Sequence, residues 1–131
     1  MKRSIIVLNF VLGLGIASLA PAQTNLGDLR DAPSGKFTPQ DFDMLWAAVD
    51  EVSRGKNIGA VKKWENTATG NGGAVKLLEV FTSTGNLDCR RLRINNHAKS
   101  LKGATTQVVC ASTDGKWLLD ADARPEPKPG A

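Results

Sequence analysis

The residues most able to take part in chemistry are two cysteines and a single histidine in a chain of 131 residues. Cys89 and Cys110 can form a disulfide, a redox dithiol or part of a metal site. Their spacing is not that of a redox motif, and His97 alone cannot complete a set of metal ligands. An even number of cysteines in an exported chain favours a structural bridge. We therefore expect a Cys89–Cys110 disulfide and no bound metal.

The remaining polar residues give little support for enzymatic chemistry. A histidine-assisted nucleophile needs a serine or cysteine beside His97, and once both cysteines are bridged only Ser100 is near it. Glu65, Asp88 and Asp114 lie near predicted strand ends, and no motif pairs them for acid–base catalysis. The chain also has no nucleophile elbow or P-loop. We expect a protein that is not an enzyme, uses no cofactor and carries His97 in a solvated loop.

A glycine-rich stretch, Thr69-Gly70-Asn71-Gly72-Gly73, has the composition of a phosphate cradle. Such a cradle leads into the N-terminus of a helix, whereas a predicted strand follows Gly73. The stretch therefore predicts a wide hairpin loop.

Basic residues are distributed unevenly along the chain. The candidate binding surface comprises Arg90, Arg91, Arg93, His97, Lys99 and Lys102, with Lys62 and Lys63 on an earlier predicted strand. Such a cluster is either an ordinary solvated sheet face or a site for an anionic glycan, such as lipopolysaccharide or peptidoglycan, or an acidic protein. The formal net charge of +4 is too small to indicate nucleic acid.

Alternation along a strand divides the three arginines between two faces of the predicted sheet. Arg91 and Arg93 share the face of Cys89, whereas Arg90 shares a face with Leu92. We therefore expect Arg90 to be partly buried and paired.

The N-terminus has the three parts of a signal peptide, predicted over residues 1–22. Met1-Lys2-Arg3 is followed by an apolar run over 5–19 and by the cleavage site Ala20-Pro21-Ala22. The alternative is a retained membrane helix, but the uninterrupted apolar run is shorter than the ~20 residues that a span needs. We expect an exported chain that begins at Gln23, is periplasmic or secreted, and has no membrane span.

The mature part is predicted to contain one domain between two polar ends. Residues 23–37 form a polar leader with at most one helical turn, and residues 38–122 form the domain. Residues 123–131 contain Pro125, Pro127 and Pro129 and are predicted to form a disordered tail.

A helix is predicted to begin at Pro39, because Thr38 can cap it and Asp41 adds negative charge to its first turn. Its expected core stripe is Phe42, Leu45, Trp46, Val49 and Val52, at helical spacing. The helix is expected to end at Arg54, with Gly55 as a left-handed cap.

Four or five β-strands are predicted after this helix. They are expected at 60–66, 74–82, 87–95, 104–112 and 116–120, with turns at 69–73, 83–86, 96–103 and 113–115. Short turns make neighbouring strands antiparallel, which places Cys89 opposite Cys110. The predicted fold class is α+β, with one N-terminal amphipathic helix packed on a four- to five-stranded antiparallel meander.

The region from Trp64 to Leu118 resembles the C-terminal domain of the seventeen-kilodalton surface antigen family of bacterial envelope proteins. The resemblance is carried by Trp64-Glu65-Asn66, Thr69-Gly70, Gly73-Ala74-Val75, Gly85, Cys89-Arg90, Cys110 and Asp114-Gly115-Lys116-Trp117. It implies an outer-membrane or surface protein without known enzymatic activity, and a helix ahead of the strands. Members often carry a lipid-modified cysteine and a glycine-rich membrane segment, and this chain lacks both. We therefore expect a soluble version of the domain, with association with the outer membrane as an open alternative.

Six residues of this pattern are taken as structural marks: Trp64, Asn66, Gly70, Gly73, Gly115 and Trp117. Trp117 is expected to lie in the core against the helix stripe, and its alternative role is an exposed binding residue. The expected function is a non-catalytic envelope protein that binds or supports another envelope component. The alternative is a periplasmic or secreted inhibitor-like domain that binds an enzyme.

Overall fold

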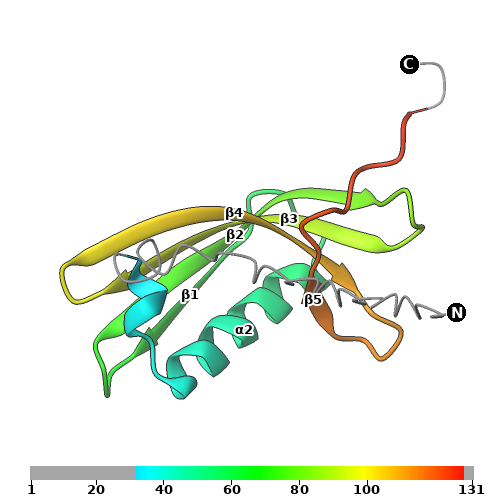
Figure 1. Ribbon diagram of the computed structural model, residues 1–131. Coiled ribbons are helices and arrows are strands. Elements are labelled where there is room, and N and C mark those ends of the chain that lie inside the picture. The colour runs from blue at the N-terminus through cyan, green and yellow to red at the C-terminus, as the bar shows by residue number, and fades with distance from the viewer. Residues whose placement is uncertain (1–31, 129–131) are drawn as a thin grey trace, which may run out of the picture.

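The computed structural model describes residues 32–128, in which one α-helix packs against a curved antiparallel sheet (Figure 1). The elements are η1 (Pro33–Lys36), α2 (Pro39–Arg54), β1 (Val61–Asn66), β2 (Asn71–Thr82), β3 (Asp88–Ala98), β4 (Leu101–Ala111) and β5 (Trp117–Leu119). The predicted signal peptide and leader residues 23–31 lie outside the described residues. No helix within residues 32–128 is long and apolar enough to cross a membrane.

The five strands form a meander in the order β1-β2-β3-β4-β5, and every neighbouring pair is antiparallel. The helix lies on one face of this sheet and packs mainly on β1 and β2. The core between them contains Leu45, Ala48, Val49, Val52, Trp64, Val75, Leu77, Leu92, Ile94 and Val109. This arrangement confirms the predicted α+β fold.

The start of α2 follows its local sequence. Thr38 Oγ1 accepts a hydrogen bond from the Asp41 N–H at 3.2 Å, and the Asp41 carboxylate accepts one from the Thr38 N–H at 2.8 Å. This capping box confirms the predicted first residue, Pro39. The helix ends at Arg54 as expected, but Gly55 is extended, with φ −80° and ψ 170°, so the left-handed cap was wrong.

The core stripe of α2 is rotated from the predicted one. Leu45, Val49 and Val52 are buried, but Phe42 and Trp46 are each 39% exposed. The helix packs mainly on β1 and β2, and its Phe42–Trp46 edge lines a groove whose other side includes Gln107 of β4. The prediction that both aromatic residues belong to the core was therefore wrong.

Two predicted loops are shorter than expected because their polar residues belong to strands. β3 continues to Ala98 and β4 begins at Leu101, so a tight turn replaces the loop predicted over 96–103. Asn71–Gly73 likewise lie in β2. At Gly73 an added Cβ would lie 2.1 Å from the Asn95 backbone oxygen, so the close approach of β2 and β3 requires glycine there.

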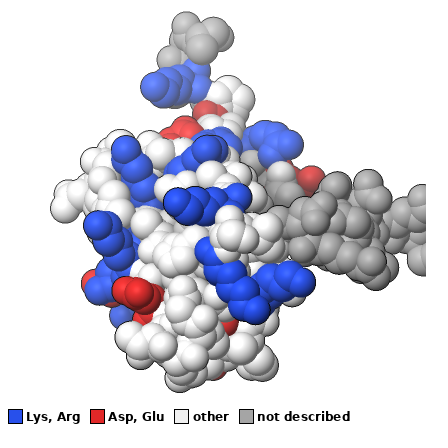
Figure 2. All heavy atoms as spheres, turned by 90° about the vertical axis from the view of Figure 1, so that its left-hand side faces the viewer, with Lys and Arg blue, Asp and Glu red and all other residues white. Residues whose placement is uncertain are grey.

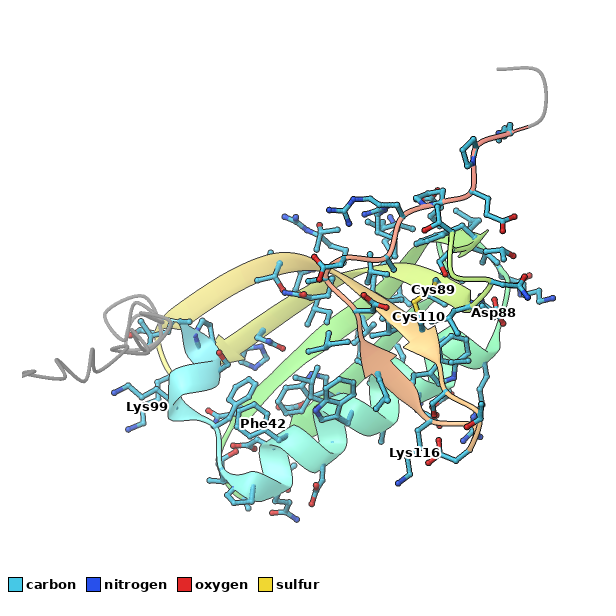
Figure 3. All side chains as sticks on the ribbon, turned by 45° about the vertical axis from the view of Figure 1, so that its right-hand side comes forward. Phe42, Asp88, Cys89, Lys99, Cys110 and Lys116 are labelled. Carbon is cyan, nitrogen blue, oxygen red and sulfur yellow. A yellow bond between two sulfur atoms is a disulfide. The ribbon has the colours of Figure 1, made fainter. Side chains whose placement is uncertain are left out.

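The disulfide joins Cys89 and Cys110, which are register partners on β3 and β4 with Cα atoms 4.1 Å apart (Figure 3). Ala123 packs beside this bridge in a small cluster with Phe81 and Val108. The Arg124 oxygen accepts from Thr84 N–H at 3.0 Å, and Glu126 N–H donates to the Thr82 oxygen at 3.0 Å. Residues 123–126 are thus held on the end of β2, contrary to the expected disordered tail.

Candidate functional site

Arg90 does not belong to a binding surface, although it was among the predicted surface residues. Its side chain is only 1% exposed and lies on the helix side of the sheet. Nε donates to the Ser53 oxygen at 2.9 Å and to the Gly55 oxygen at 3.3 Å, and the guanidinium pairs with Asp88. Arg90 therefore satisfies carbonyl groups at the C-terminus of α2, which explains why Gly55 needs no left-handed cap.

The N-terminus of α2 is held by a second buried group, the carboxylate of Asp41. It accepts hydrogen bonds from Asn66 Nδ2 at 2.7 Å, Thr69 Oγ1 at 2.8 Å and Asn71 Nδ2 at 2.9 Å. Burial acts to raise the pKa of Asp41, but the Thr38 N–H and these three side chains outweigh it and hold the pKa well below its usual value. The Asn66–Asn71 turn is thereby fastened to the helix.

The other structural marks support the same helix–sheet contact. Trp64 is buried and meets Phe37 edge to face, with ring centroids 5.2 Å apart. Gly70 and Gly115 have φ values of 75° and 80°, which their turns require. Trp117 is half-buried and packs on the core. Trp64 and Trp117 therefore pack in the helix–sheet contact, and Gly70 and Gly115 allow their turns.

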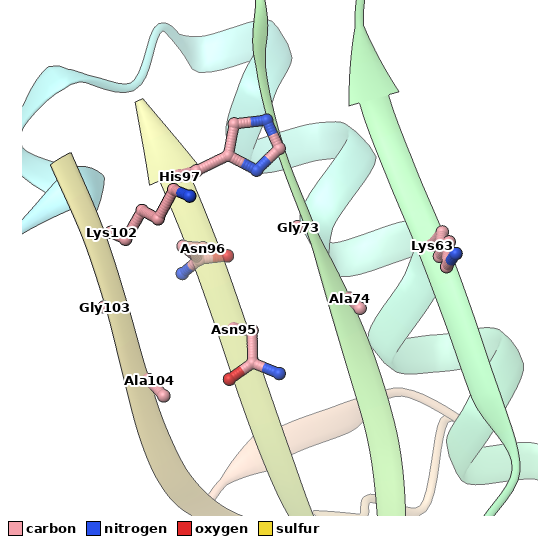
Figure 4. Close-up of a pocket in the computed structure, with 9 residues that line it drawn as sticks. All are labelled: Lys63, Gly73, Ala74, Asn95, Asn96, His97, Lys102, Gly103 and Ala104. Atoms are coloured by element: carbon pink, nitrogen blue, oxygen red, sulfur yellow. The ribbon is translucent and has the colours of Figure 1, made fainter. Parts of the chain in front are cut away.

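A different set of side chains lies on the sheet face that points away from α2. Register places Lys63, Ala74, Asn95 and Ala104 in one row across β1 to β4, and Lys76, Arg93 and Thr106 in the row beside it. The row on the other side runs from Glu65 on β1 through Gly72 to His97 and Lys102. Small side chains at Ala74 and Ala104 leave a shallow depression of about 560 Å³ (Figure 4).

We call this surface the outer cationic face, defined by Lys63, Lys76, Arg93, His97 and Lys102 around Ala74, Asn95 and Ala104. Four cations of this face form no ion pair among the described residues: Lys63, Lys76, Arg93 and Lys102. Arg91 shares the face but is paired with Glu79 at 2.9 Å. Figure 2 shows more basic than acidic surface at the end of the molecule where the β1–β2 and β3–β4 turns lie.

The residues of the predicted surface are divided between different parts of the sheet. Arg93, His97 and Lys102 lie on the same face of the sheet, whereas Arg90 is buried in the core. Lys99 lies in the β3–β4 turn, and the disulfide joins the two strands near the other end of this hairpin. Lys76 had not been predicted as a site residue, although its alternation with Val75 and Leu77 on β2 carries the signal.

His97 lies on strand β3 and not in a loop, which corrects its predicted position. An added Cβ at Gly72 would lie 2.9 Å from His97 Cε1, so the imidazole covers this glycine. No described hydrogen bond joins His97 to a carboxylate or a hydroxyl that would form a catalytic pair. Residues 32–128 contain no group of three or more His, Cys, Asp or Glu side chains placed to hold a metal.

Comparison of the chain with protein-family models, with curated proteins and with solved structures finds no match. The function must therefore be inferred from the residues and their geometry.

Proposed function

We propose that this protein is a non-catalytic exported module of the bacterial envelope whose outer cationic face binds an anionic glycan. The observation that carries the proposal is a group of four cations on four consecutive strands of one open sheet face, Lys63, Lys76, Arg93 and Lys102, which form no ion pair among the described residues. Unpaired charges of one sign raise the local concentration of a ligand of opposite sign.

The spacing of the cations suits a polymer better than a single small anion. Neighbouring strands lie about 4.8 Å apart, so the cations of four strands extend across roughly 15 Å. A chain of acidic sugars lying across the strands can meet several of them in succession. Ala74 and Ala104 leave room for sugar rings, and the amide of Asn95 between them can donate and accept hydrogen bonds.

The N-terminal sequence and the resemblance to the surface antigen family support the export and envelope parts of the proposal. Several of the residues that carry the resemblance, among them Trp64, Asn66 and Arg90, maintain the helix–sheet contact. A protein of this kind can keep its fold through those residues while its outer face determines the ligand. The inhibitor-like alternative would instead require a stable complex with an enzyme.

The test measures binding of the mature protein to a uronic-acid hexasaccharide and to maltohexaose, which is neutral. We expect binding of the acidic sugar alone, weakening as salt increases. Lys76→Glu combined with Arg93→Glu should reduce the affinity at least tenfold.

The matched control combines Lys62→Glu with Lys116→Glu, which changes the net charge equally. Lys62 contacts Glu51 of the helix and Lys116 lies near the β4–β5 turn, so both are away from the outer cationic face. Equal loss of binding in the two double variants would show a net-charge effect and contradict the proposed site. Co-purification with a hydrolase in place of glycan binding would favour the inhibitor-like alternative.

A further inference from the structure

The helix side of the sheet holds an apolar groove that is separate from the outer cationic face. It has a volume of about 380 Å³ and lies between α2 and the β4–β5 part of the sheet. Phe42, Trp46 and Leu119 line it and are 39%, 39% and 56% exposed. Among the residues that the structure describes, none of those lining the groove is charged. It therefore suits uncharged apolar side chains.

An open strand edge borders this groove. β5 pairs with only Val109, Cys110 and Ala111 of the 11-residue strand β4. Among the described residues, no strand pairs with the same edge of β4 over Leu101–Gln107. The edge therefore continues past the point where β5 stops.

The backbone groups at this edge can be assigned from the ladder. The Val108 oxygen accepts from the Asp120 N–H at 2.9 Å, so the polar groups of Val108 point toward the β5 side. Because backbone direction alternates along a strand, Lys102, Ala104 and Thr106 also direct their N–H and C=O groups to that side. Such a row is a template for another strand.

We propose that β4 accepts an extended segment of a partner protein as an added strand in line with β5. Alternate apolar side chains of this segment would enter the groove. The intervening side chains would lie on the opposite face, beside Lys102 on β4 and near Arg93 on β3. Neither cation is ion-paired among the described residues, so these intervening side chains are acidic. The partner segment therefore alternates apolar and acidic residues.

This mode combines two sources of recognition. Main-chain hydrogen bonds along the β4 edge supply affinity, and the groove and cations select alternate side chains. The inference shares Lys102 and Arg93 with the outer cationic face, but it does not require glycan binding, because the strand edge and the helix-side groove lie outside that face.

The probe is a synthetic heptapeptide of alternating valine and glutamate, titrated against the mature protein. We expect saturable binding, and at least tenfold weaker binding of a valine–lysine peptide. An N-methylated version of the valine–glutamate peptide, which cannot pair along β4, should also bind at least tenfold more weakly. Equal binding of the methylated peptide would overturn the proposal.

Two pairs of protein variants locate the site. Thr106→Pro removes an edge N–H that no described strand uses, and Thr106→Val keeps it, so only the proline variant should lose peptide binding by tenfold or more. Leu119→Gln makes the groove polar and should weaken binding, whereas Leu118→Gln changes a comparably exposed neighbour outside the groove and should not.

Circular dichroism and thermal melting establish that each variant is folded, and the leucine pair remains decisive if Thr106→Pro unfolds. Equal effects of Leu119→Gln and Leu118→Gln would overturn the proposed groove. Self-association abolished by Thr106→Pro would identify a second copy as the occupant and would also overturn the proposal. Loss of glycan binding without loss of peptide binding would leave this inference standing.

Discussion

The guanidinium of Arg90 lies over the indole ring of Trp117, with Cζ 4.9 Å from the ring centroid. The same side chain donates to Ser53 and Gly55 at the end of α2 and pairs with Asp88. One side chain on β3 thus connects the helix C-terminus to β5. A buried cation with this set of partners is costly to remove, because its partners are left unsatisfied.

Arg90→Ala is expected to reduce the free energy of unfolding by about 3 to 5 kcal/mol, because it breaks a buried hydrogen-bonded pair. Arg90→Lys keeps the charge but cannot reproduce the guanidinium geometry, so it should also destabilise strongly. Arg91→Ala is the control, since its pair with Glu79 is half-exposed and worth about 1 kcal/mol or less. Denaturant unfolding measures all three. Equal losses at Arg90 and Arg91 would contradict this role.

Trp117→Ala should reduce the free energy of unfolding by about 2 to 3 kcal/mol. A fully buried tryptophan typically loses ~3 to 5 kcal/mol on truncation, and Trp117 is only half-buried. Leu118→Ala, on the same strand and 53% exposed, should cost less than about 1 kcal/mol. A change below about 1 kcal/mol for Trp117→Ala, with the fold intact, would instead make this residue part of a surface site.

The lowered pKa of Asp41 predicts a specific loss of stability in acid. Its pKa is lower in the folded than in the unfolded chain, so the stabilisation by its ionised form is complete above the unfolded pKa of about 4. That stabilisation is lost as the pH falls from about 4 toward the lower folded pKa.

Asp41→Asn should be less stable than the unmodified protein at neutral pH by about 2 to 3 kcal/mol. It should also lack this part of the loss of stability in acid. Denaturant unfolding between about pH 7 and pH 2 compares the two proteins. Asp43→Asn, in the same helical turn but exposed, is the control and should retain the pH dependence. An unchanged acid profile in Asp41→Asn would show that another carboxylate controls it.

The disulfide should be present in the mature protein and should stabilise it by about 3 kcal/mol relative to Cys89→Ser combined with Cys110→Ser. Mass spectrometry without reductant measures the thiol content. Two free thiols would contradict the bridge, and equal stability of the double variant would contradict its energetic role.

The local parts of the fold could be predicted because their signals lie close together in the sequence. Thr38, Pro39 and Asp41 specify the start of α2 within four residues, and the capping box has the expected partners. Alternation on β3 separated Arg90 from Arg91 and Arg93, and the antiparallel register brought the two cysteines together.

The remaining features depend on contacts between distant segments. Asp41 meets Asn66 and Asn71, which are 25 and 30 residues away, and no local pattern indicates that this acid is buried. The exposure of Phe42 and Trp46 depends on where α2 lies across the sheet. Polar residues around His97 indicated a loop, whereas on an open sheet face polar residues are equally compatible with a strand.

The meander also has a kinetic consequence. Each of its four ladders joins strands that are consecutive in the chain, so hairpin formation requires only short loop closures. The longest closure is the one that brings β5 onto α2. Topologies rich in local contacts fold faster than those that pair distant strands. The sheet can therefore grow by adding one neighbouring strand at a time, without the pairing of distant segments.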